Sequence, residues 1–118
     1  MNELFGKYVR QIREELHEER AEYSVRKVAG RLGIQPSYLS KVERCEVAPP
    51  SEATIVRLAA VLEQDADVLL AMAGKVSADL REAIIKRPKV FAELIRQLKD
   101  APDKALLRVV REVRDGDW

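Results

Sequence analysis

The sequence predicts an all-α protein of 118 residues, and three observations favour this fold class. Every convincing apolar segment repeats with the spacing of a helix, and none shows the sustained alternation of a strand. Aromatic residues form only 5% of the chain, so the core must rest on Leu, Val, Ile and Ala. Capping residues, glycines and prolines divide these segments at positions where helices begin and end.

The first helix is expected from about residue 4 to residue 18. Its apolar stripe consists of Leu4, Tyr8, Val9, Ile12 and Leu16. The charged stretch that follows, up to Tyr23, is expected to be a loop or a frayed helix end.

Two short helices with a very short connection come next. Ser24 is expected to cap the first of them, because its hydroxyl can accept a bond from a free N–H of the first turn. Gly33 is expected to end that helix in the left-handed conformation. Gln35 caps the next helix and Pro36 opens it, since a fixed φ suits the first helical position. We expect this helix to end near Arg44 and an apolar set to hold the pair together: Val28, Ala29, Leu32, Ile34, Leu39 and Val42.

A fourth and a fifth helix follow an irregular stretch from 45 to 50, with Ser51 and Asp65 as their expected caps. The buried faces are expected to contain Ile55, Leu58, Ala59 and Leu62, and then Val68, Leu69 and Met72. Gly74 closes the fifth helix. We therefore expect one domain over residues 1–74 and a helical extension over residues 75–118.

The extension reads as three amphipathic helices, beginning near Ser77, at Pro88 and after Pro102. Their apolar faces contain Leu80, Ile84 and Ile85; Val90, Phe91, Leu94, Ile95 and Leu98; and Leu106, Leu107, Val110 and Val113. These faces can fold back on the first domain or pair with the same helices of a second chain, and we favour pairing. The segment is too short for a ligand-sensing domain with an ordinary pocket.

Several classes of function are excluded by composition. One cysteine and one histidine rule out an intrachain disulfide, a Cys-based zinc site and a pair of histidine ligands, so we expect no metal and no cofactor. No phosphate-binding glycine loop or nucleophile elbow occurs, so we expect no enzyme. No apolar run approaches the ~20 residues of a membrane span. The N-terminus also lacks a signal-peptide pattern, so we expect no membrane partner and a cytoplasmic protein.

The net charge of +1 gives by itself no support for a nucleic-acid partner. The distribution is uneven, since residues 24–45 contain five basic residues and one acidic residue, whereas residues 14–22 are acidic. The basic stretch is compatible with phosphate contact. An ordinary solvated helix face is the alternative, and charge alone does not separate the two.

The short helix pair has features of a DNA-reading unit. Its tight turn forces a sharp angle between the helices, glycine fits the strained position, and the small Ala29 allows close approach. A helix of this kind, propped outward on a scaffold, can enter a major groove about 12 Å wide. The outer face of the second helix is mostly polar: Pro36, Ser37, Ser40, Lys41 and Arg44.

The stretch from Ser24 to Arg44, SVRKVAGRLGIQPSYLSKVER, resembles the helix-turn-helix of the phage-repressor family (Cro and cI, or Xre-type). Pro50-Ser51 and the two helices after it continue the family pattern, so the resemblance covers roughly residues 4–73. It implies a five-helix lambda-repressor-like DNA-binding domain, followed here by about three C-terminal helices. It also implies double-stranded DNA as the partner and a dimer on half-sites about 34 Å apart.

The resemblance also implies roles for single residues. Ser37 and Lys41 match positions that reach base edges, while Gln35 and Tyr38 match positions that touch bases or backbone. The alternative for each is an ordinary exposed helix residue. Arg13 and Glu43 match a family pair that orients the recognition helix. We expect that pair to be partly buried, and the alternative is a surface pair worth little.

Three features depart from the family pattern. Val25 stands where the family has a phosphate-binding glutamine, so Arg26, Lys27 or the helix N-terminus would have to compensate. Cys45 stands where glycine is usual, which costs roughly 1 kcal/mol if the backbone is left-handed. We favour a half-buried filler over a redox sensor for this cysteine. The glutamate-rich loop before Ser24 is longer than usual and is expected to point away from DNA.

The sequence therefore predicts a sequence-specific transcription regulator, a repressor that binds a palindromic operator as a homodimer through its C-terminal helices. The expected DNA-contacting residues are Gln35, Pro36, Ser37, Tyr38, Ser40, Lys41, Arg44, Arg26 and Lys27. The alternative from another class is a protein-interaction module, such as an antitoxin, whose C-terminal helices bind a partner protein.

Overall fold

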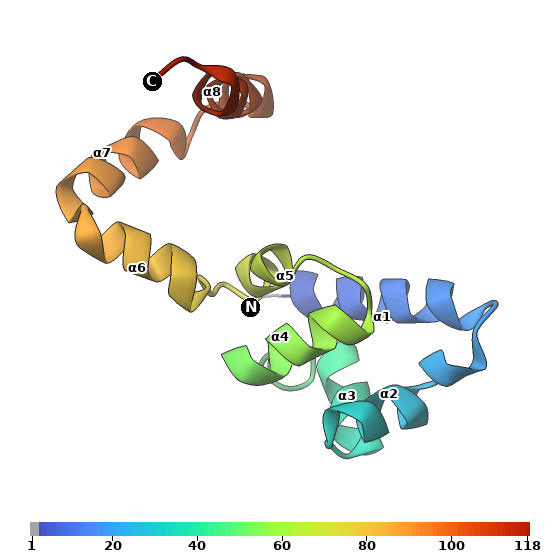
Figure 1. The fold of residues 1–118 in the computed structure, drawn as a ribbon. Helices are drawn as coiled ribbons and strands as arrows, with labels where there is room; N and C mark the ends of the chain where they lie inside the picture. The colour runs from blue at the N-terminus through green and yellow to red at the C-terminus, as the bar shows by residue number, and fades with distance from the viewer. Residues whose placement is uncertain (1–2) are drawn as a thin grey trace. The chain divides into compact units, whose positions relative to one another are not determined.

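The computed structural model describes residues 3–118, and over that range the chain is all-helical (Figure 1). Eight α-helices and one short 3-10 helix follow one another without a strand among the described residues. The chain divides into two compact units, of which the first ends at Ala78 and the second covers Asp79–Trp118. The predicted all-α class is confirmed.

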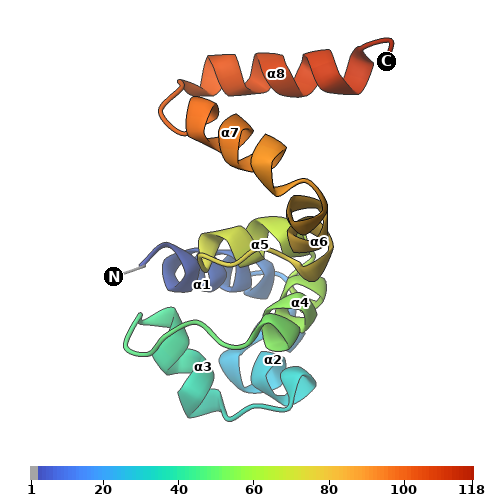
Figure 2. The same cartoon turned by 90° about the vertical axis from the view of Figure 1, so that its left-hand side faces the viewer.

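The first unit contains five α-helices and the 3-10 helix. In chain order they are α1 (Leu4–His17), η1 (Ala21–Tyr23), α2 (Val25–Leu32), α3 (Pro36–Glu43), α4 (Glu52–Val61) and α5 (Ala66–Met72). Two views show α2 and α3 together at one end of this unit, with α1 and α5 together at the other (Figures 1 and 2).

The expected caps begin three of these helices. Ser24 Oγ accepts a hydrogen bond from the Lys27 N–H at 3.2 Å, and Ser51 Oγ accepts one from the Thr54 N–H at 3.3 Å. Asp65 Oδ1 accepts a hydrogen bond from the N–H of Asp67, the second residue of α5, at 2.8 Å. These side chains satisfy N–H groups that have no partner within the first helical turn. The three predicted caps are thus confirmed.

All five helices of the first unit contribute to one core. The predicted faces of α2 and α4 are buried as expected. The core consists of Phe5, Val9, Tyr23, Val28, Ala29, Leu32, Leu39, Val42, Ile55, Leu58, Ala59, Leu62, Leu69 and Leu70.

Two predicted core positions are wrong. Leu4 is 57% exposed, and the next residue, Phe5, is buried instead, because the buried stripe of α1 continues from Phe5 to Val9 at a spacing of four. In α5, Val68 is 47% exposed, and Leu70 takes the expected place in the core beside Leu69.

The stretch between α1 and α2 is more ordered than the sequence suggested. It contains η1, and Tyr23 at its end is 2% exposed. The Tyr23 hydroxyl donates to the Val61 carbonyl at 3.0 Å, and Arg20 lies over the Tyr23 ring. Arg20 also pairs with Glu63 at 2.9 Å. The expected loop is therefore anchored to the end of α4.

Apart from Ala78, which ends the first unit, the second unit contains α6 (Ala78–Lys86), α7 (Pro88–Leu98) and α8 (Asp103–Asp115), with Pro88 at the start of α7 as expected. None of the three helices contains a buried residue. The exposed large apolar residues of this unit are Leu80, Ile85, Val90, Leu94, Ile95, Leu107, Val110, Val113 and Trp118. None of the described helices is both long and apolar enough to cross a membrane.

Candidate nucleic-acid interface

The turn between α2 and α3 is built around one left-handed glycine. Gly33 has φ +69°, which is strained for residues with a side chain. The amide of Ile34 then bonds back to the Ala29 carbonyl at 3.0 Å, which closes the end of α2. Pro36 occupies the first turn of α3, and Leu39 and Val42 anchor that helix in the core. The predicted helix-turn-helix geometry is present.

One side of α3 is turned away from the core and carries the polar residues that the sequence singled out. Ser37, Lys41 and Arg44 are exposed, and Ser40 is half-buried beside them. Their spacing of three and four places them on one helix face. We call this surface the recognition face; its residues are Gln35, Pro36, Ser37, Ser40, Lys41 and Arg44.

The other predicted contact residues lie in different surroundings. Arg26 and Lys27 are exposed near the start of α2. Tyr38 is half-buried and packs against the core, so part of its ring stabilises the domain.

A buried ion pair joins α1 to the end of α3. Arg13 Nε donates to Glu43 Oε2 at 2.6 Å and Arg13 Nη2 donates to Oε1 at 2.9 Å, while the two residues are 6% and 4% exposed. Arg13 Nη1 also donates to the Tyr23 carbonyl at 3.1 Å. This two-bond geometry fixes the last turn of α3 relative to α1.

The backbones of α1 and α3 approach closely at Gly6, a contact that the sequence reasoning missed. A Cβ atom at this position would lie 2.3 Å from the Val42 carbonyl oxygen and 2.8 Å from Cys45 Sγ. Only glycine therefore allows this approach. Just after α3, the backbone is left-handed at Cys45, with φ +62°. The sequence had raised this possibility, since glycine is usual at this position. Cys45 is half-buried, and its thiol lies 3.5 Å from the Glu3 carbonyl oxygen.

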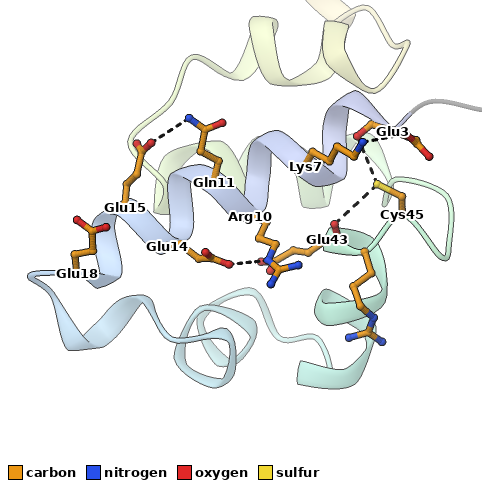
Figure 3. Close-up of a pocket in the computed structure, with 10 residues that line it drawn as sticks. Glu3, Lys7, Arg10, Gln11, Glu14, Glu15, Glu18, Glu43 and Cys45 are labelled. Carbon is orange, nitrogen blue, oxygen red and sulfur yellow. Dashed lines mark hydrogen bonds and ion pairs between the residues drawn. The ribbon is translucent and has the colours of Figure 1, made fainter.

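An open hollow along the outer side of α1 contains several carboxylates (Figure 3). Most have a partner on the same helix: Glu3 pairs with Lys7 at 3.1 Å, and Arg10 pairs with Glu14 at 2.6 Å. The hydrogen bond from Arg10 lowers the pKa of Glu14. No group of acidic, His or Cys side chains suited to a metal ion occurs in the part of the chain that the structure describes. This hollow therefore offers no metal site.

Comparison with known proteins identifies the domain. The family model described as helix-turn-helix domain matches residues 4–72. Comparisons with curated proteins and with solved structures gave no significant match. The matched range contains all of α1 to α5, including the Gly33 turn, the recognition face and the Arg13–Glu43 pair. The chain belongs to the helix-turn-helix domain family, consistent with an Xre-type regulator.

Proposed function

We propose that the protein is a sequence-specific transcription regulator whose α3 reads the major groove of double-stranded DNA. The observation that carries this proposal is the polar recognition face on a helix that is held outward by the Gly33 turn and by the Arg13–Glu43 pair. A helix presented in this way fits the major groove, and base edges there identify each base pair.

Different residues would supply specificity and affinity. Ser37 and Lys41 lie one turn apart on the recognition face, and a lysine ammonium can donate to O6 and N7 of guanine. Gln35 and Tyr38 flank them and would support base or backbone contacts. Arg26 and Lys27 are exposed cations that would neutralise phosphates, which position the protein without reading sequence.

The second unit supports the proposal of a homodimer on a palindromic operator. A segment of ~40 residues rarely folds alone without a metal, a disulfide or a partner. The unit has no buried residue, and its apolar side chains line an open face that includes Val90 and Leu94. Pairing with a second copy would cover this face and give the two-fold symmetry of a palindrome. Occupation of a promoter by such a dimer would repress transcription without chemistry.

The same exposed faces favour a second candidate, a module that binds another protein, such as an antitoxin. Light scattering on the full chain separates the two. A dimer that becomes a monomer in Leu94→Glu supports the homodimer. The matched control is Val56→Glu on α4, where an equally exposed valine is replaced. A wild-type chain that is monomeric at tens of micromolar contradicts the homodimer and favours the second candidate.

DNA binding itself is tested by selection of the full chain on random duplex DNA. The proposal predicts enrichment of one sequence with two related half-sites. Failure to enrich any sequence at low salt would contradict it. Alanine at Lys41 is expected to relax the preference at one base position, whereas loss of a phosphate contact would weaken all sequences alike.

A further inference from the structure

A small hollow lies where α1, the start of α2 and α3 meet, on the flank of the recognition face. Arg10 and Arg13 reach it from α1, and Val25 at the start of α2 forms one wall. The α3 side of the hollow is lined by Ser40, Glu43 and Arg44. Three arginines and a hydroxyl from two separate segments of the sequence thus converge beside the proposed DNA-reading surface.

The residues that line this hollow include three cations and one anion. Arg13 and Glu43 neutralise each other through two hydrogen bonds. Arg10 and Arg44 are the other two cations among the lining residues, and each is ion-paired with a glutamate. Their own partners, Glu14 and Glu46, do not line the hollow, and the side chains in both pairs are more than half exposed. Exposed pairs of this kind are weak, so both guanidinium groups can turn to a stronger anion.

Val25 indicates which contact the residues of this hollow can replace, namely a contact with a phosphate. Valine has no side-chain donor, so the phosphate contact that the resemblance implies at this position is missing. The sequence pointed to Arg26 or Lys27 as substitutes, but neither lines the hollow that Val25 faces. Arg10 does, and Figure 3 shows it between α1 and α3, beside Glu43. Its guanidinium offers several donors to a single phosphate group.

We propose that Arg10, with Ser40 and Arg44, binds one DNA backbone phosphate in this hollow and so replaces the clamp lost at Val25. The inference rests on the proposed DNA-binding function. A backbone phosphate fits better than a base, because Ser40 and Arg44 line this hollow together with residues of α1, whereas Ser37 and Lys41 do not line it. The phosphates of a duplex border the groove in which a recognition helix lies.

The test measures affinity of the full chain for its selected duplex as a function of salt. Arg10→Ala is expected to reduce the slope of log K against log salt by about 0.9 for each bound chain, and to weaken binding on the order of tenfold. Arg108→Ala is the matched control, since Arg108 also pairs with a glutamate four residues later, at 3.1 Å, but lies in the second unit. The control is expected to leave the slope unchanged.

A second variant separates a local contact from overall charge. Arg10→Ala combined with Glu14→Gln restores the net charge of the wild type, and the proposal predicts that the lower slope persists. Recovery of the wild-type slope would overturn it. Neutral methylphosphonates, placed one at a time in the duplex, give an independent readout. One position should weaken the wild type but not Arg10→Ala, and absence of any such position would also overturn the proposal.

Failure of the inference can be told apart from failure of the proposed function. If the wild-type chain binds no duplex at low salt, both fall together. If the wild type binds a selected sequence but Arg10→Ala and Arg108→Ala behave alike, only the phosphate site at Arg10 is wrong.

Discussion

Removal of either partner of the Arg13–Glu43 pair should destabilise the domain far more than removal of a surface pair. The two side chains are 7% and 4% exposed and share hydrogen bonds of 2.6 and 2.9 Å. Glu43→Ala leaves the arginine charge buried without its partner, a change that costs about 3–5 kcal/mol in such sites. That is a large share of the ~5–15 kcal/mol that stabilises a typical domain.

Replacement of both partners should recover most of this loss. Apolar side chains of similar volume remove both buried charges, and such exchanges are often neutral in proteins. In Arg13→Met combined with Glu43→Leu, the Tyr23 carbonyl also loses the donor that lies 3.1 Å away. This bond is worth about 1 kcal/mol, so the double variant is expected to lie about that far below the wild type.

Urea denaturation followed by circular dichroism measures these differences, with Arg10→Ala as the surface control. Arg10 forms an exposed pair with Glu14 at 2.6 Å, and this pair is expected to contribute only about 0.3–0.5 kcal/mol to stability. A cost of Glu43→Ala no larger than that of Arg10→Ala would contradict a stabilising role of the buried pair. A double variant that loses the full sum of its two single variants would contradict it equally, because the pair would then have no coupling.

Four further substitutions have predicted effects on the free energy of unfolding and are measured by the same denaturation. Gly6→Ala should lose about 1–3 kcal/mol, because its Cβ would lie 2.3 Å from the Val42 carbonyl oxygen. Gly30→Ala should gain about 0.5–1 kcal/mol, since a Cβ there would meet nothing within 4 Å apart from its chain neighbours and the backbone of α2 itself; equal effects at the two glycines would contradict the close approach. Cys45→Gly should raise the free energy of unfolding by up to about 1 kcal/mol, because glycine adopts φ +62° without strain. A lower free energy of unfolding would show that packing of the thiol matters more than this strain. Ser24→Ala should lose about 1 kcal/mol with the cap of α2, whereas an unchanged midpoint would show that the 3.2 Å bond contributes nothing.

Local features of the fold could be predicted from the sequence because their causes are local. Ser24, Ser51 and Asp65 cap the helices that directly follow them, and Gly33 ends the helix that directly precedes it. The buried face of α4 also follows from helical spacing alone. Each of these predictions depends on residues within one or two turns.

Features that depend on distant segments could not be predicted in the same way. Leu4 and Phe5 are adjacent apolar residues, and only packing against other helices decides which of them is buried. Tyr23 lies in a charged stretch, and its burial depends on the end of α4. The close approach at Gly6 and the hollow at Arg10 each join segments from different helices. The one local signal for the close approach was Gly6 itself, a glycine in the first turn of an otherwise regular helix.

Selection of the full chain on random duplex DNA, followed by the same selection with Lys41→Ala, is the sharpest test of whether α3 reads DNA. We expect the wild type to enrich one sequence with two related half-sites. We expect the variant to lose preference at one base position in each half-site and to keep the rest. No enrichment by the wild type at low salt, or an identical enriched sequence with the variant, would contradict the claim that α3 reads DNA through its recognition face.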